Sequence, residues 1–124
     1  MGKDRKIDCD EFNLLPLEER VEFVLKNHYA PDGAILDYAD FHEAQLGKVK
    51  LKKARLCEAD FWGAKLQKSD FEGSDLSNAQ LQGADLWKAD LRNCILKGAD
   101  LHVTNLEDAD LTNSALDGAN LRKT

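Results

Sequence analysis

Long apolar runs, cysteine and proline are all scarce in this sequence, and each shortage excludes a class of protein. The 124 residues include two prolines and three cysteines, Cys9, Cys57 and Cys94. An odd number of widely spaced cysteines argues against a disulfide framework. The first residues lack the apolar core of a signal peptide, and no segment is apolar enough to cross a bilayer. We therefore expect a reduced, cytoplasmic protein that makes no membrane contact.

Positive charge is also in short supply. The formal net charge is −6 and the pI is about 5.0. Nucleic-acid-binding proteins usually carry a surplus of Lys and Arg that pairs with phosphates. Direct binding of DNA or RNA is therefore not expected.

What the sequence has in abundance is Leu and Ala, arranged with a period of five. Residues 34–123 divide into eighteen blocks of five, with Leu or Phe at the third position of every block. The first position is small in every block except the one that begins with Val49. A straight helix would scatter these leucines around its axis, and a straight strand would send successive leucines to opposite faces. The chain must therefore change direction inside each block.

Each block is best interpreted as a short extended side followed by a corner. The first and third residues lie two apart, so both point inward, and the second points outward. The fifth position holds Gly five times and Asn three times, and both residues tolerate turn geometries. No proline follows Pro31, which is typical of backbone that pairs with a neighbouring coil.

The blocks resemble the pentapeptide-repeat family, whose pattern is A(D/N)LXX. ADLWK, ADLRN, ADLHV, ADLTN and ANLRK match this pattern outright, and the resemblance covers residues 34–123. It implies an all-β solenoid, a right-handed quadrilateral β-helix with four blocks and twenty residues per coil. The 90 residues of the repeat then form about 4.5 coils.

Residues 1–33 lie outside the repeat and are predicted to form a cap, with the repeat domain at 34–124. We expect a helix over residues 16–27, because apolar residues recur there at helical spacing. The predicted apolar stripe consists of Leu17, Val21, Val24 and Leu25. Such a stripe would cover the open cross-section of the first coil. The alternative is a helix that docks onto a partner.

The other end of the repeat has no corresponding cover. Leu116 and Leu121 belong to the last blocks, and open backbone edges invite pairing. We therefore predict an end-to-end homodimer through the C-terminal coil, with Leu116 and Leu121 at the dimer end. The alternative is a charged rim from Arg122 and Lys123 that blunts the edge.

The sequence offers no arrangement typical of catalysis. His42 and His102 share one face but lie three coils apart, too far to bind one metal ion. Leu, Phe and Ala fill the interior, so no cleft is expected. We predict a protein that is not an enzyme and has no catalytic residues, metal or cofactor.

Function is therefore expected on the outer faces. Trp62 stands in the column of His42 and His102, Trp87 stands on the next face, and exposed Trp is enriched in protein interfaces. Lysines gather on two adjacent faces, where they could attract an anionic partner or simply balance the Asp columns. The candidate partner contacts are Trp62, Trp87, His42, His102, Lys52 and Lys53. The predicted function is a non-catalytic protein–protein interaction or scaffolding module.

The resemblance also supplies an alternative. The pentapeptide-repeat family includes quinolone-resistance proteins that resemble duplex DNA and bind DNA gyrase, a type II topoisomerase. A DNA mimic requires a long, strongly acidic, dimeric rod. This repeat is short, and lysine faces interrupt its negative charge. A continuous acidic strip on one face would favour this alternative.

Overall fold

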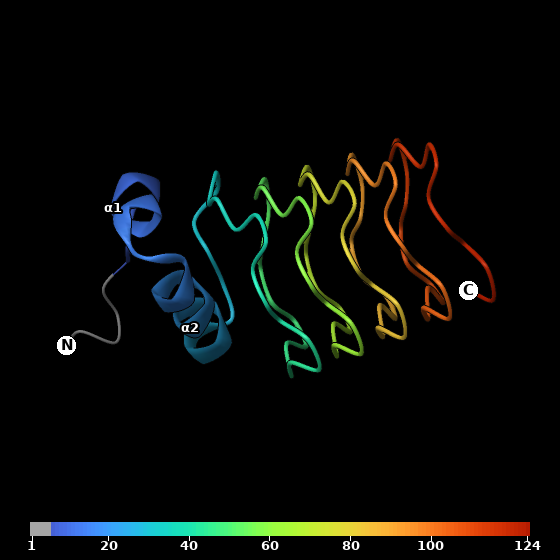
Figure 1. Ribbon diagram of the computed structural model, residues 1–124, viewed down its shortest axis with the longest axis horizontal. Helices are drawn as coiled ribbons and strands as arrows, with labels where there is room; N and C mark the ends of the chain where they lie inside the picture. The colour runs from blue at the N-terminus through green and yellow to red at the C-terminus, as the bar shows by residue number, and fades with distance from the viewer. Residues whose placement is uncertain (1–5) are drawn as a thin grey trace.

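Two short helices precede the repeat and lie at one end of the stack of coils (Figure 1). The computed structural model describes residues 6–124. Helix α1 spans Cys9–Leu14, and the Asp8 carboxylate at its N-cap accepts a hydrogen bond from the Glu11 backbone N–H. Helix α2 spans Leu17–Asn27, close to the predicted 16–27, whereas α1 was not predicted. Neither helix of the described chain is long and apolar enough to cross a membrane.

The rest of the chain winds into successive coils that stack along the long axis of the molecule (Figure 1). The second residue of each block pairs in parallel with the residue twenty positions later, from Ile35 with Arg55 to Asp100 with Asn120. A coil therefore contains twenty residues, or four blocks, as the family resemblance implied. The right-handed sense of the coil stays a prediction.

The pairing differs in one respect from an all-β fold. All β-pairing between coils in residues 6–124 consists of isolated bridges, and no continuous strand forms there. The reason is geometric, because the second residue of a block pairs with both neighbouring coils and the chain then turns. Each side of the solenoid is one bridge wide.

The corners have the same conformation throughout the repeat. The fifth residue has positive φ in all eighteen blocks, between 53° at Lys53 and 74° at Gly73. In most blocks the carbonyl of the third residue accepts the N–H of the next block's first residue, as from Ala39 to Leu36 at 3.0 Å. A left-handed residue at this place is the signature of a type II turn. Thirteen of the eighteen corner residues are not glycine, so the stacked coils impose this conformation on ordinary side chains.

The first and third positions fill the interior. The third-position side chains from Leu36 to Leu101 are at most 1% exposed, and Val49 is completely buried. Three phenylalanines form a cluster in which Phe41 and Phe61 stack with ring centres 5.2 Å apart, while Phe71 meets Phe61 edge-on. Each buried apolar side chain contributes about 1.5–3 kcal/mol of transfer free energy, which explains how so regular a backbone remains folded.

The helices supply contacts that a preceding coil would otherwise make. Phe12 of α1 and Val24 of α2 are buried and join the core. The Asn13 carboxamide oxygen accepts the Ile35 N–H at 2.8 Å, and Arg20 donates to the Ile35 carbonyl at 2.7 Å. These two side chains thus pair both backbone groups of the first bridge residue on that face.

The predicted apolar stripe of α2 is correct at three of its four residues. Leu17 and Val21 pack against the core beside the buried Val24. Leu25 is 41% exposed, because it follows Val24 directly and points about 100° away around the helix axis.

The last coil is less covered than the first. Leu116 is partly buried, Leu121 is 41% exposed, and within residues 104–124 the Leu106, Leu111 and Leu116 N–H groups have no backbone acceptor. The predicted dimer through Leu116 and Leu121 stays a prediction.

Candidate functional surface

The Asp residues at the second position orient the side chains at the fourth. Asp60 accepts the Trp62 backbone N–H at 2.9 Å, and Asp85 accepts that of Trp87 at 3.2 Å. Asx turns of this kind hold the backbone of the following corner in place. Many of the Asp residues that might suggest acid–base chemistry therefore stabilise the turns and aim the next outward side chain.

Two adjacent faces carry the predicted tryptophans. The His–Trp face is the column of fourth-position residues His42, Trp62, Gln82, His102 and Arg122. The lysine–Trp face comprises the fourth-position residues Gly47, Gln67, Trp87 and Glu107, together with Lys48, Lys68 and Lys88 at the fifth position.

Two lysine side chains approach the Trp87 ring on the lysine–Trp face. The Lys68 Nζ atom is 5.4 Å from the centre of the Trp87 ring, and the Lys88 Nζ atom is 4.7 Å from it. Both distances lie within the range of cation–π attraction, which is worth about 0.5–1 kcal/mol at exposed sites. The two contacts favour this position of the indole on the surface.

The Trp87 ring forms part of the wall of an open recess of about 620 Å³. Gly47 leaves the fourth position of the first coil without a side chain, which opens the recess above Gln67. The lining residues are Gly47, Lys48, Gln67, Lys68, Asp85, Trp87 and Asn105. The recess therefore combines an aromatic wall with a cationic rim.

The positive charge of this rim is not balanced from within. Among residues 6–124, Lys48, Lys68 and Lys88 form no ion pair with a carboxylate. The nearby Asp85 carboxylate instead accepts amide hydrogen bonds from Gln67 and Asn105, both at 3.0 Å. The three lysines follow one another on successive coils. Unit charges about 5 Å apart repel by about 0.8 kcal/mol in water.

Trp62 lines a second recess, of about 530 Å³, on the His–Trp face. Its side chain is 50% exposed, and the recess brings it together with His102, Lys65 and Val103. The structure thus joins two of the predicted contacts, Trp62 and His102.

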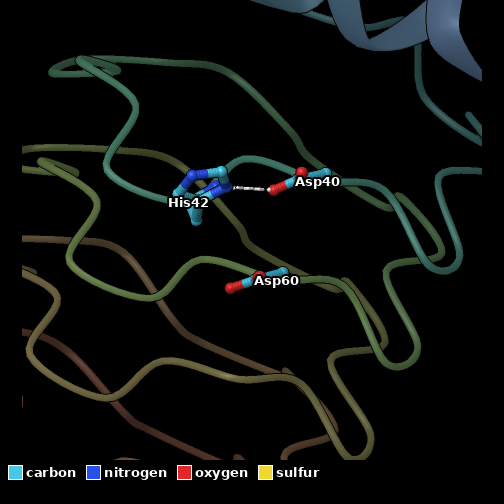
Figure 2. A group of neighbouring side chains, drawn as sticks. All are labelled: Asp40, His42 and Asp60. Carbon is cyan, nitrogen blue, oxygen red and sulfur yellow. Dashed lines mark hydrogen bonds and ion pairs between the residues drawn. The ribbon is translucent and has the colours of Figure 1, made fainter.

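His42, in contrast, turns toward Asp40. Its Nδ1 atom lies 2.6 Å from the Asp40 Oδ1 atom (Figure 2). This hydrogen bond raises the pKa of the His42 imidazole and lowers the pKa of the Asp40 carboxyl.

Two clusters in the described chain place three metal-ligating side chains close together. One comprises Asp40, His42 and Asp60, and the other comprises Asp70, Glu72 and Asp90. In the second, Arg92 lies 2.7 Å from Asp90 and Lys52 lies 3.4 Å from Glu72. Lysine and arginine side chains of the chain itself therefore occupy the second cluster.

The predicted contacts Lys52 and Lys53 lie near this second cluster, and Lys52 takes part in its ion pairs. Lys52 is bound to Glu72, and Lys53 is exposed at the following corner. Neither lines the recess of Trp62 or that of Trp87. The structure does not bring these two lysines to the tryptophans.

The repeat lattice is matched by a known family profile. The profile described as pentapeptide repeats (8 copies) matches residues 54–86, 74–113 and 88–122. The chain belongs to the pentapeptide-repeat family. No curated protein matches the chain in sequence.

Solved structures of pentapeptide-repeat proteins resemble the chain as well. One from the thylakoid lumen of Arabidopsis thaliana is 33% identical, with a TM-score of 0.69, and the match covers 76% of this chain and 62% of that one. One from Nostoc PCC 7120 is 30% identical, covering 87% of this chain and 79% of that one, with a TM-score of 0.64. The Cyanothece 51142 protein Rfr23 is 20% identical, covering 87% and 93%, and its TM-score of 0.72 shows the shared fold alone. The chain thus spans less than two thirds of the plant protein.

The main surface feature that the sequence did not reveal is the pairing of Trp87 with Lys68 and Lys88. Lys68 precedes Trp87 by nineteen residues, so the two meet diagonally across neighbouring coils. The twenty-residue coil of pentapeptide-repeat proteins contains this signal, because residues nineteen to twenty-one apart are neighbours on the surface.

Proposed function

We propose that this pentapeptide-repeat protein is a non-catalytic protein–protein interaction module that binds an acidic segment of a partner through the recess around Trp87. The observation that carries the proposal is the contact of the Trp87 ring with both Lys68 and Lys88, whose charges have no carboxylate partner in the described chain. Carboxylates of a bound segment would relieve the repulsion between the lysines, while the segment's apolar atoms cover the indole.

The shortness of the cationic patch favours an acidic protein segment over a nucleic acid. Lys48 to Lys88 spans two coil steps, or about 10 Å. On the next coil, the fourth-position column continues with Glu107 and the fifth-position column with Asp108. The phosphates of a nucleic acid would extend beyond the lysines and meet these carboxylates, which repel them. Two or three Asp or Glu side chains of a protein segment fit within the length of the patch.

The filled interior favours an interaction module over an enzyme. Leu, Phe and Ala side chains occupy the centre of the solenoid, and both tryptophan recesses are open to solvent. Catalysis requires a pocket that excludes water and positions reactive groups. Partner binding requires only an exposed, well-ordered surface, which the stacked coils provide.

The DNA-mimic alternative ranks second. Its distinguishing feature would be a continuous acidic strip. The second-position column of the His–Trp face begins with Asp40 and Asp60 but is interrupted by Gln80 and ends in Asn120. The lysine–Trp face next to it is cationic.

The predicted homodimer is a separate proposal that concerns the C-terminal coil. Partly exposed Leu116 and Leu121, with unpaired N–H groups nearby, are its basis. Sedimentation at micromolar concentration should show a dimer that Leu121→Lys disrupts. A monomeric wild type would contradict it.

The binding proposal is tested with a hexaglutamate peptide as the probe. We expect weak, salt-sensitive binding by calorimetry, and a double variant Lys68→Gln/Lys88→Gln should lose about tenfold or more in affinity. Lys97→Gln, on a different face, is the matched control and should bind like the wild type.

Two results would overturn the proposal. One is hexaglutamate binding that is equal in the wild type and the double variant. The other is tighter binding of a single-stranded oligonucleotide than of hexaglutamate, which would instead assign the recess to nucleic acid.

A further inference from the structure

The cluster of Asp40, His42 and Asp60 is formed by residues of two adjacent coils (Figure 2). Asp40 and Asp60 are bridge partners at the second position, and His42 is the fourth-position residue of the upper coil. One possible ligand atom from each side chain lies within 4.8 Å of those of the other two. The stacking of the coils thus brings an imidazole and two carboxylates together on the His–Trp face.

Backbone contacts hold these side chains in place. The Asp40 Oδ1 atom accepts both the His42 backbone N–H, at 3.1 Å, and a contact from the imidazole ring. The Asp60 Oδ1 atom accepts the Trp62 N–H at 2.9 Å. The second oxygen of each carboxylate makes no hydrogen bond within the described chain and is available to a ligand.

We propose that Asp40, His42 and Asp60 form a binding site for a divalent transition-metal ion of the Zn²⁺ or Ni²⁺ type. An imidazole nitrogen with two carboxylate oxygens is a donor set that such ions accept, while solvent water completes the coordination shell. The imidazole disfavours Ca²⁺ and Mg²⁺, which prefer all-oxygen ligands. Binding requires only that the ring exchange its contact with Asp40 for the ion.

The charge balance of the cluster supports a cation rather than a mere acidic patch. The Asp40 and Asp60 carboxylates lie within 4.8 Å of the His42 imidazole. Among residues 6–124 no Lys or Arg forms an ion pair with Asp40 or Asp60. At the corresponding positions of another face, Lys52 and Arg92 form ion pairs with Glu72 and Asp90 of the Asp70 cluster. An external cation can take that place at the His42 cluster.

The repeat contains its own control for this proposal. Asp100, His102 and Asn120 occupy the same three lattice positions, three coils further on. The only difference in residue type is Asn120 in place of Asp60, and its amide donates a hydrogen bond to Asp100 at 3.2 Å. A neutral amide that already engages the neighbouring carboxylate is a poor metal ligand. The second set should therefore not bind the ion.

The test is titration of the full chain with Ni²⁺, followed by calorimetry and by the ¹H–¹⁵N signals of the histidine rings. Because thiolates also bind such ions, the titration uses a Cys9→Ser/Cys57→Ser background. We expect one bound ion and selective broadening of the His42 signals over those of His28 and His102.

Two substitutions make the result decisive. Asp60→Asn, which copies the natural Asn120, should weaken binding by about tenfold or more, whereas Asp100→Asn should leave it unchanged. Asn120→Asp should raise the stoichiometry from one ion to two. Circular dichroism checks that each variant is folded. The Asn substitutions should keep the turn, because Asn105 and Asn120 each accept the backbone N–H two residues later in the wild type, as Asp60 does.

The proposal is overturned if Ni²⁺ does not bind at millimolar concentration, if Asp60→Asn binds as tightly as the background, or if the signals of His28 broaden first. None of these outcomes bears on the recess around Trp87, since its lysines take no part in the metal site.

Discussion

Val103 is the β-branched residue among the corner residues, and its backbone conformation predicts that replacing it will stabilise the protein. Its φ is 60° and its side chain is 54% exposed. An L-residue in the left-handed region is strained by about 1–2 kcal/mol, and Asn tolerates that region better than Val. The Val103 N–H donates to the Arg122 carbonyl at 3.0 Å, a contact that any residue other than proline keeps. Val103→Asn should therefore raise the free energy of unfolding by about 1 kcal/mol.

Gly83 provides the reciprocal experiment one coil earlier in the same column. Its φ is 69°, and a Cβ atom added there would meet no atom within 4 Å. Gly83→Val therefore introduces backbone strain without a steric clash. The strain of about 1–2 kcal/mol is offset by about 0.4–1 kcal/mol, because the unfolded chain becomes less flexible. The net expectation is a loss of about 1 kcal/mol.

The assay is urea and thermal unfolding followed by circular dichroism. For a chain of this size, about 1 kcal/mol corresponds to a shift in Tm of about 3–6 °C. Because repeat proteins can unfold in stages, tryptophan fluorescence must give the same transition. The reasoning is refuted if Val103→Asn leaves stability unchanged or lowers it, or if Gly83→Val has no effect.

Three further predictions concern the buried first position and the cap. Ser74→Ala should lower the free energy of unfolding by about 1 kcal/mol in a urea titration, because the buried Ser74 hydroxyl forms hydrogen bonds with two backbone groups of the facing turn. The Ser69 hydroxyl has no hydrogen-bond partner in the described chain. Ser69→Ala should therefore be neutral or stabilising in the same titration. Asn13→Ala should cost about 0.5–1.5 kcal/mol in a thermal melt, because the exposed Ile35 N–H exchanges its side-chain acceptor for water, and an unchanged Tm would contradict the role given to this side chain. Burial raises the pKa of the Cys94 thiol to about 12, so iodoacetamide at pH 8 should modify Cys94 only in denaturant, as judged by mass spectrometry of peptides, and labelling of the native protein would oppose this.

The fold was largely predictable because every block solves the same packing problem. The five-residue period required a corner in each block, and the family pattern implied the twenty-residue coil. Helix α1 was not predicted because its one buried residue, Phe12, acquires its role by tertiary packing in the core, including an edge-on contact with Phe23 whose ring centre is 5.6 Å away. A six-residue helix carries too little periodicity to be recognised.

The corner residues show how the lattice overrides local preference. Gly and Asn, the residues that predict a left-handed conformation, occupy fewer than half of the fifth positions. Lys48, Glu58 and Val103 adopt the same φ with no local signal for it. Hydrogen bonds between coils, such as that from the Lys48 N–H to the Gln67 carbonyl at 2.8 Å, hold these residues in place. The period of the sequence predicts this conformation better than the residue type does.

The candidate sites were less predictable because they depend on pairs of residues in different coils. The sequence analysis compared His42 with His102 in the same column, and the distance between these two residues excluded a shared metal ion. The structure pairs His42 with Asp60, eighteen residues later, because a fourth-position side chain faces the second position of the next coil. The same relation joins Asp37 to Arg55 at 2.9 Å and Gln67 to Asp85 at 3.0 Å.

This eighteen-residue relation explains why similar Asp residues have different chemistry. Gln67 donates to Asp85, so an amide already occupies that carboxylate. Asp60 faces an imidazole instead, so its free oxygen can share a cation with it. What an Asp of this solenoid can bind thus depends on the residue eighteen positions before it as well as on the fourth residue of its own block, as the contact of Arg92 with Asp90 shows. Lys65 stands where Asp40 does in the metal cluster, so Lys65→Asp/Gln67→His, and not Gln67→His alone, should make Asp85 resemble Asp60. Ni²⁺ binding by this double variant would be the direct measure of the eighteen-residue relation.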